Sequence, residues 1–392
     1  MEEKLQKIIE EAGGIFEFDK LPHKTVKLFF DLVQDKFSFN QEFIKNIYQS
    51  NFGSFNVFFI NKMEIDASAN TFADINGNKV DYILIYAGLP FALLNIFLRI
   101  LSHPSTFIDI GDCNKEALNE DDTMNIEDIK KKPDQITLFP KCKIREFYAM
   151  ELAKSALDFI FCHELAHLYR GHFEYKNSNK KNMQLPHPLD VGNKDNNKIL
   201  LLQAIEFDAD LIGMKISWRL MSLLGKRFAL LKKECLDSNC YSALFAVYQS
   251  PSHAFRVLTI STYTFFRVYA ENWNPKTQFF DSKGTKEHPD EVIRMSYILY
   301  DFIKSQDPIV ENEDISVEWN QTSPFFKNLI ISLNQAEEGF ALIQGKEINL
   351  RPLFSVLQQE KQFNEYLEDI LTKRNELILG LIPFMRGSDF NN

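Results

Sequence analysis

Two histidines and one glutamate stand at the spacing that a metal ion requires. Residues His163-Glu-Leu-Ala-His167 form the pattern H-E-x-x-H, inside a run from about Arg145 to His172 that is expected to be helical. Residues four apart on a helix lie on the same face, so His163 and His167 can offer their imidazoles to one metal ion. Glu164, the next residue along, can then reach a metal-bound water as a general base.

A second acidic segment can complete such a site. Two histidines leave a zinc ion in need of a third protein ligand and of an open position for water. Glu206, within Ala204-Ile-Glu-Phe-Asp-Ala-Asp210, can supply that ligand. Asp210 lies one turn later and can hydrogen-bond a ligating histidine from behind, which fixes its tautomer. The flanking residues are mostly apolar, so both carboxylates are expected to point inward, where they need partners.

Each of these sites has a simpler alternative. An E-x-x-x-D pattern on a helix is usually a solvated acidic face, and Glu206 could also be a salt-bridged acid of the core. The histidine pair could be a helix surface without metal. The chance occurrence of H-E-x-x-H is roughly one in a hundred chains of this length, so the two motifs together carry the metal hypothesis.

The elements that position these residues are predicted from periodicity. Residues 1–50 look mainly helical, and Ser54–Asn61 and Tyr82–Tyr86 are predicted strands, with residues 70–77 as the turn that feeds the second one. His167 and Glu206 are 39 residues apart, which allows two helices joined by the polar loop Lys176–Lys198. Further helices are expected at about 199–224, 253–271, 289–305, 324–342 and 359–383.

The predicted fold is α+β and predominantly α-helical, with a small sheet near the front of the chain. Its expected regions are 1–110, 111–145, 146–272 and 273–392, which we take as parts of one integrated domain. The first contains a strand at about 81–87, the second is an acidic insertion or flap, the third holds the metal-site helices and the fourth is helical. Residues 103–145 are polar and show no convincing periodicity, which is the basis for the flap.

Composition narrows the class of protein. The 392 residues are 45% hydrophobic and 25% charged, which excludes wholesale disorder. A net charge of −10 argues against general nucleic-acid binding. Five cysteines form no even framework, which fits a reducing cytoplasm. The first 14 residues are acidic and amphipathic, unlike a signal peptide. The apolar stretch Tyr82–Leu101 has the length of a membrane span, but Gly88, Pro90, Asn95 and Arg99 interrupt it, so a buried strand, turn and helix are expected.

The two motifs resemble those of gluzincin peptidases of the HtpX and CAAX-prenyl-protease type and, more loosely, of the soluble phage-exclusion Lit peptidases. In the first group an Asn-Ala-Phe-Ala motif, a glycine turn and an edge strand ending in Gly-Leu precede the active-site helix. This chain has Asn70-Thr-Phe-Ala73, then Asn76-Gly77, then Tyr82 to Gly88-Leu89. The resemblance implies a zincin-like catalytic core with a small sheet and added helices. It also makes the strand at 81–87 the sheet edge that receives a peptide.

The same resemblance implies further site residues. That family carries a later His-Pro followed by an arginine, and His288-Pro289 with Arg294 is similar. By analogy His288 and Arg294 would stabilise an oxyanion or hold the glutamate ligand. His253 with Arg256 is a rival pair for that role, and His172 stands where the family often has a further histidine. About 75 residues separate Gly88 from His163, far more than in the HtpX type, which favours a soluble, Lit-like or otherwise divergent member.

The expected function is therefore zinc-dependent endopeptidase. Zn²⁺ would be held by His163, His167 and Glu206, with Asp210 behind a histidine and Glu164 as general base. The expected partner is a protein or peptide substrate, with no nucleic acid and no membrane, in the cytoplasm. The alternative is a zinc-binding regulatory or scaffold protein without catalysis, and a lower-ranked one is a membrane-associated peptidase anchored by residues 82–101.

Overall fold

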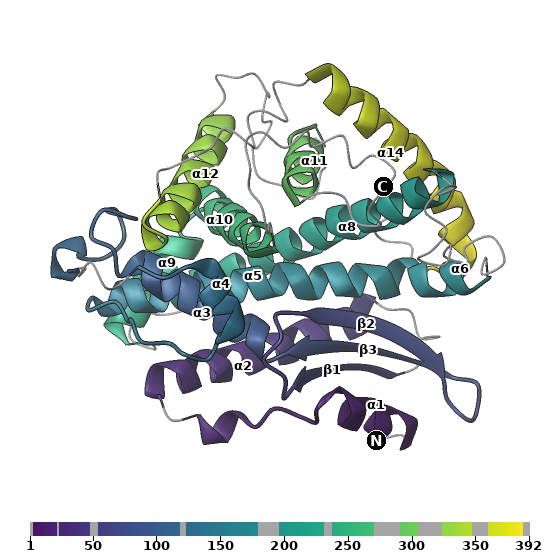
Figure 1. Ribbon diagram of the computed structural model, residues 1–392, viewed down its shortest axis with the longest axis horizontal. Coiled ribbons are helices and arrows are strands. Elements are labelled where there is room, and N and C mark those ends of the chain that lie inside the picture. Colours follow the sequence, from purple (N-terminus) through teal and green to yellow (C-terminus); the bar gives the residue numbers. More distant parts are fainter. Residues whose placement is uncertain are drawn as a thin grey trace.

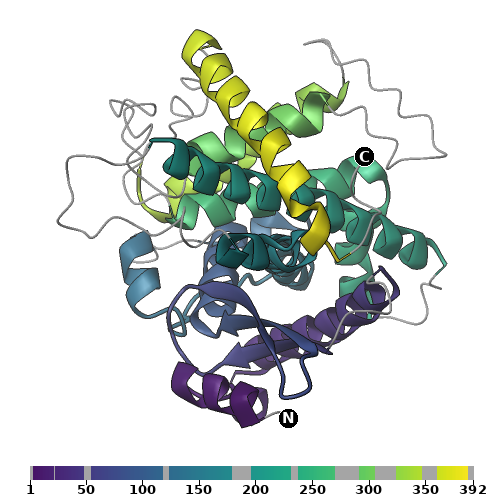
Figure 2. The same ribbon diagram turned by 90° about the vertical axis from the view of Figure 1, so that its right-hand side faces the viewer.

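The computed structural model describes residues 3–21, 23–47, 54–117, 123–178, 196–230, 237–269, 291–304, 324–346 and 360–386. Figure 1 shows a small sheet on one side of a long central helix and a group of helices on the other side. This arrangement confirms an α+β, predominantly helical fold. Figure 2 shows the same layers from the end of the molecule, with the C-terminal helix α14 (Glu360–Leu381) crossing the side opposite the sheet.

The sheet has three strands in the order β1-β3-β2, so β3 (Lys79–Tyr86) lies in the middle. It pairs in parallel with β1 (Ser54–Ile60) and antiparallel with β2 (Ala67–Ala73). The strand expected at 81–87 is therefore not a sheet edge, and the residues expected as a turn near Asn70 form the edge strand β2. The apolar run of β3 explains this correction, because a strand buried on both faces reads as continuously hydrophobic.

Alternation along β3 distributes its side chains between two clusters. Ile83 and Ile85 pack with the phenylalanines of α2 (Lys24–Ile47) in the main core. Val80, Tyr82 and Leu84 point the other way and pack against Leu5 and Ile9 of the amphipathic helix α1 (Glu3–Ala12). Side chains two apart on a strand share a face, so both faces of the sheet are covered.

The central helix α5 (Lys143–Arg170) carries the H-E-x-x-H segment and is buried along nearly its whole length. It packs against β2 on one side and against α3 (Gly88–Leu101), α8 (Asn196–Ala229), α9 (Ser238–Tyr248) and α10 (Pro251–Tyr269) on others (Figure 1). Such enclosure accounts for its lack of a single apolar face. Gly171 ends it with a left-handed φ of 74°, a conformation that suits glycine, and the short helix α6 (His172–Ser178) begins directly afterwards.

The stretch considered as a membrane span contributes strand β3 and helix α3, and all 14 residues of α3 are buried. Its two polar interruptions are satisfied internally: Arg99 donates from Nε to Oδ1 of Asn95 at 3.0 Å and from Nη2 to Oγ1 of Thr137 at 3.0 Å. Among the described residues, no helix has both the length and the apolar character needed to cross a membrane.

The described parts of the expected flap pack against the rest of the protein. Arg145, at the start of α5, is fully buried, and its guanidinium donates to five backbone carbonyls between Leu101 and Ile110 at 2.7–3.0 Å. Two buried residues of α4 (Ile126–Lys131), Ile126 and Ile129, belong to the main core. These contacts attach the described parts of 103–145 to α5 and to the main core. Backbone carbonyls and buried apolar side chains, such as Phe107 and Ile110, both contribute to this packing.

Three further helices cover the side of α5 and α8 that faces away from the sheet: α11 (Glu291–Lys304), α12 (Pro324–Ile343) and α14. α14 packs on α8, and the chain then returns toward the sheet. Fully buried Arg386 pairs with Asp81 of β3 at 3.2 Å and also with Glu174 of α6. The C-terminal region is thereby joined to the sheet by buried charges.

Candidate metal centre

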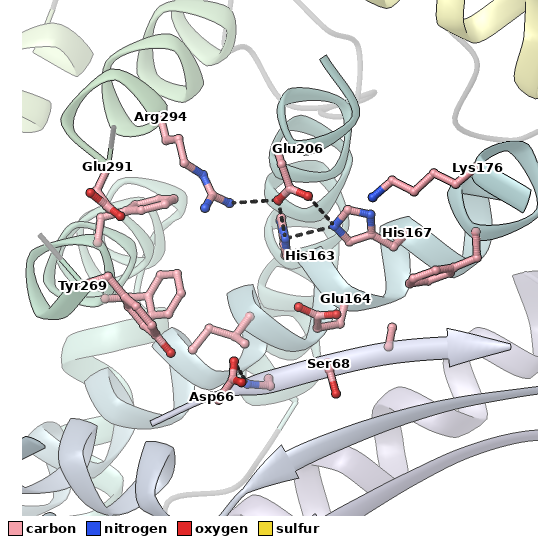
Figure 3. A pocket seen from close by; sticks show the side chains of 16 residues that line it. Asp66, Ser68, His163, Glu164, His167, Lys176, Glu206, Tyr269, Glu291 and Arg294 are labelled. Atoms are coloured by element: carbon pink, nitrogen blue, oxygen red, sulfur yellow. Dashed lines mark hydrogen bonds and ion pairs between the residues drawn. The ribbon is translucent and has the colours of Figure 1, made fainter. Parts of the chain in front are cut away.

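α5 and α8 lie side by side, and they approach closely at the candidate site. A Cβ added to Gly213 of α8 would lie 2.9 Å from Cα of His163, so only glycine permits this approach. The close packing brings Glu206 of α8 opposite His163 and His167 of α5. Figure 3 shows the three side chains converging.

The three side chains offer nitrogen and oxygen atoms at distances that suit one metal ion. Nε2 of His163 lies 3.2 Å from Nε2 of His167, and the two nitrogens lie 3.6 and 3.7 Å from the carboxylate oxygens of Glu206. Ligands about 2.0–2.1 Å from a tetrahedral zinc are about 3.3 Å apart, close to these separations. All three residues are buried, and this group can hold a metal ion.

Asp210 lies behind His163, where the sequence placed it. Its Oδ1 is 2.9 Å from Nδ1 of His163, which leaves Nε2 facing the metal position. Burial alone would lower the pKa of His163, but the adjacent carboxylate of Asp210 outweighs burial and raises it. The carboxylate therefore fixes the orientation of the imidazole and increases its basicity.

Arg294 of α11 holds Asp210 in turn. Its guanidinium donates to both oxygens of Asp210 at 2.8 and 2.7 Å, and the hydroxyl of Tyr297 donates to the same carboxylate at 2.9 Å. Nη2 of Arg294 also lies 3.8 Å from Oε2 of Glu206, the contact drawn in Figure 3. Of the two roles considered for this arginine, the geometry favours holding the glutamate. His288, the expected companion of Arg294, lies outside the described residues.

His167 has a different support, which the sequence did not reveal. Its Nδ1 lies 3.0 Å from Nδ1 of His172, and Nε2 of His172 lies 3.2 Å from Oδ2 of Asp208. Asp208 also accepts hydrogen bonds from Arg170 at 2.7 Å and from Arg374 of α14 at 2.8 Å. When Nε2 of His167 binds a metal, its Nδ1–H donates to His172, and His172 donates to Asp208.

The signal for this second support was present but ambiguous. Asp208 stands between Glu206 and Asp210, yet a residue two positions away on a helix faces another side. His172 follows Gly171, the glycine that ends α5, so the direction of its side chain depends on the turn. Both residues are fully buried. The positive groups around Asp208 hold the pKa of its carboxyl far below the usual range despite burial, so it is charged.

Glu164 points away from the three ligands, toward strand β2 (Figure 3). The backbone N–H of Ala69 favours the charged form of the Glu164 carboxyl and lowers its pKa. Burial, opposed by His163 and reinforced by the charge of Glu206, raises the pKa of Glu164 to about 7. Glu164 thus lies beside the metal position without belonging to the ligand group.

A cavity of about 470 Å³ opens over these residues, within the rough 300–1,000 Å³ range of ligand sites. The three ligands, Glu164 and Arg294 line it. One side is the start of β2, residues 66–69, and other walls come from α5, α6, α10 and α11. The described parts of 103–145 do not line it, and neither do His253 and Arg256. Arg256 pairs with Asp109 at 3.0 Å, away from the cavity, so this pair is not placed to serve the site.

Along the edge of β2 beside the cavity, no other strand of the described chain pairs with the backbone. The bonds from Tyr86 N to Asp66 O and from Asp74 N to Asn78 O show that even-numbered residues of β2 pair with β3. Alternation in antiparallel pairs directs the backbone of Ala67, Ala69 and Thr71 outward. The N–H groups of Ala67 and Thr71 donate to the side chains of Asp66 and Asn70, each at 2.8 Å.

Comparison of the chain with protein-family models, with curated proteins and with solved structures found no match.

Proposed function

We propose that this chain is a zinc-dependent endopeptidase with a gluzincin-type, zincin-like core. The observation that carries the proposal is the buried group of His163, His167 and Glu206, whose ligand atoms all lie within 4.8 Å of one another. Two imidazoles and one carboxylate are the donor set of hydrolytic zinc sites that keep a fourth position open. A bound zinc ion supplies a Lewis acid that lowers the pKa of water and polarises a carbonyl.

Glu164 is the proton carrier in this proposal. It borders the cavity from the same helix turn as His163, and the three ligands already complete the protein's share of the metal site. Its carboxylate takes the proton of the attacking water and passes it to the leaving amine. Asp210 and His172 hold the two imidazoles in place, and Arg294 fixes Asp210 and Glu206.

The substrate is a protein or peptide in extended form. The outward backbone groups of Ala67 and Ala69 lie at the cavity, so an extended chain can add to β2 as a further strand. This edge replaces the strand at 81–87 that the resemblance implied. Docking exchanges the hydrogen bond from Ala67 to Asp66 for a backbone bond to the substrate.

We place this enzyme in the cytoplasm, with no nucleic-acid or membrane partner. Four cysteines within the described ranges, Cys113, Cys142, Cys162 and Cys240, are free thiols, as a reducing compartment favours. The net charge of −10 opposes general binding to the phosphate backbone of nucleic acids.

Two variants at one metal test the proposal. Glu164→Gln should keep zinc and fold while hydrolysis of an unfolded protein such as casein falls by about 10²–10⁴-fold. Glu206→Gln should lose zinc affinity and thermal stability together. The exposed Glu11→Gln on α1 is the matched control. Zinc content, melting temperature and hydrolysis are measured on all three proteins. Zinc-loaded wild-type protein that hydrolyses nothing would contradict the proposal and favour a non-catalytic zinc protein.

A further inference from the structure

The two ends of the cavity differ in chemistry. At the start of β2, Ile160 of α5 and the rings of Phe265, Phe266 and Tyr269 of α10 form an apolar wall, and the carboxylates of Asp66 and Glu291 also line this end. Phe173 and Lys176 of α6 line the other end, and Figure 3 shows Lys176 extending toward His167. The metal ligands lie between these two ends. A chain that lies along β2 therefore meets an apolar wall on one side of the metal and a cation on the other.

The apolar end is firmly built. The hydroxyl of Tyr269 donates to the carbonyl of Ile65 at 2.7 Å, which fixes α10 to the segment that leads into β2. Rings of Phe265 and Phe266 have centroids 5.2 Å apart, and the guanidinium of Arg294 lies over Phe266 at 5.1 Å. These contacts hold the rings in place, so an apolar side chain that enters here displaces water without reorganising the wall.

The end of the cavity at α6 has a cation, Lys176, that is available for a ligand. Lys176 is partly buried, and in the part of the chain that the structure describes no carboxylate lies within ion-pair distance of its ammonium. The neighbouring acids are engaged elsewhere: Asp208 by Arg170 and Arg374, and Glu174 by Lys79 at 3.0 Å and by Arg386. A carboxylate from outside is therefore the fitting partner for Lys176.

The direction of β2 sets the order of these features along a bound chain. Its start lies beside Ile160 and Glu164, while its end is near α6, because Lys79 pairs with both Ala73 and Glu174. Antiparallel addition is slightly more stable per residue than parallel addition. An antiparallel substrate therefore runs from the Lys176 end to the Tyr269 end.

We propose that the cleft selects an extended protein segment with an acidic residue on the N-terminal side of the cleaved bond and a large apolar residue on its C-terminal side. This inference rests on the proposed endopeptidase function and adds the class of substrate. It concerns side chains of this chain that touch substrate, and none of them binds the metal.

Binding to metal-free protein tests the selection without catalysis. Fluorescent peptides are compared in pairs that carry Glu or Lys at the N-terminal position and Phe or Ser at the C-terminal position. The Glu–Phe peptide should bind about 10-fold tighter than the Lys–Phe or Glu–Ser peptide, as expected for one charge contact or one buried ring. Lys176→Glu should reverse the Glu-over-Lys preference, and Phe265→Ala should remove the Phe preference. The exposed Lys7→Glu on α1 is the control for the charge change.

Cleavage by zinc-loaded protein gives the second readout. Mapping the cut sites in an unfolded protein should show Asp or Glu before, and Leu, Phe or Met after, the cleaved bond. Cuts without these preferences, or with the two in reversed order, overturn the selection while the endopeptidase proposal stands. Equal binding of all the peptides overturns the selection as well, whether or not the protein hydrolyses anything.

Discussion

The two histidines of the candidate metal site are supported in different ways. Behind His163 stands a carboxylate in direct contact, Asp210, at 2.9 Å. Behind His167 stands another imidazole, His172, at 3.0 Å, and only its far nitrogen contacts a carboxylate, Asp208. Both carboxylates come from α8, two residues apart, so one helix serves both histidines from different faces.

The difference shows in the protonation of the two imidazoles. The pKa of His163 is raised, because the neighbouring charge of Asp210 outweighs burial. Burial lowers the pKa of His167 well below its usual value, and the charge of Glu206 opposes this only partly. A direct carboxylate therefore makes His163 the more basic ligand, while the relay through His172 chiefly orients His167. The variants below separate these two roles.

The largest effect is expected for Asp210→Asn. This change removes the charge that His163 and Arg294 share, and leaves Arg294 without its main partner. Zinc affinity should fall by about 100-fold, at the upper end for residues behind a ligand, and stability should fall by about 3 kcal/mol. Competition with a zinc chelator and urea unfolding of the metal-free protein measure the two quantities. The exposed Asp35→Asn on α2 should change neither.

Asp208→Asn should separate metal binding from stability. Arg170 and Arg374 lose a shared carboxylate, so the loss of stability should match that of Asp210→Asn, about 3 kcal/mol. Zinc affinity should fall only about 10-fold, because the charge acts on His167 through His172. Equal losses of zinc affinity in the two variants would show that the support through His172 contributes as much to zinc binding as the direct contact of Asp210 with His163.

His172→Phe should give a smaller change that is specific to His167. The ring keeps much of the volume but cannot accept from Nδ1 of His167, so zinc affinity should fall several-fold, up to about 10-fold. The imidazole nitrogen NMR signals of His167 in the zinc-loaded protein should shift, while those of His163 stay in place. Shifts of equal size in both histidines would contradict separate supports.

The smallest effect is expected at an ion pair remote from the metal. Asp109 contacts Arg256, whose hydrogen bond and charge overcome burial and lower the pKa of Asp109. A lowered pKa stabilises the folded protein above the unfolded value of about 3.9, and this contribution is lost as the pH falls through the folded value. Asp109→Asn should cost under about 1 kcal/mol at pH 7, since Asp109 is half exposed, and progressively less as the pH falls below about 3.9 and through the folded value.

The ion pair between Asp109 and Arg256 is the reference against which the contacts behind His163 and His167 are compared. Zinc affinity of Asp109→Asn should equal that of the wild type, and urea unfolding at several pH values measures its stability. A loss of zinc affinity would mean that general destabilisation, rather than the contacts behind the histidines, governs metal binding.

How much of the site could be predicted depends on whether its geometry is local. The i and i+4 spacing of His163 and His167 defines a common face on any helix, and the same spacing relates Glu206 to Asp210. The structure brings these four residues together. The role of His172 and Asp208 behind His167 was not predicted, because the directions of their side chains depend on the turn at Gly171 and on the rotation of α8 against α5. Arg374 is 166 positions from Asp208, and no local pattern links them.

The fold, like the site, has features that the local sequence predicts and features that depend on tertiary packing. The helical content and the small sheet followed from periodicity, and the buried strand and helix within residues 82–101 were predicted as such. The order of the strands was not, since hydrophobicity showed that β3 is buried without showing which strand lies beside the metal site. The contacts of Arg145 with backbone carbonyls of residues 101–110 could not be predicted either, because carbonyls leave no trace in side-chain composition.

The sequence by itself determined the chemistry: which residues can bind a metal, which acid lies next to them, and which helices carry them. These properties depend on residue type and on the fixed geometry of one helix. Only the tertiary structure decided which strand edge borders the cavity, which carboxylate supports which histidine, and that Lys176 and the phenylalanines of α10 lie at opposite ends. Those relations come from the packing of helices and strands distant in sequence, which the preferences of a local segment do not specify.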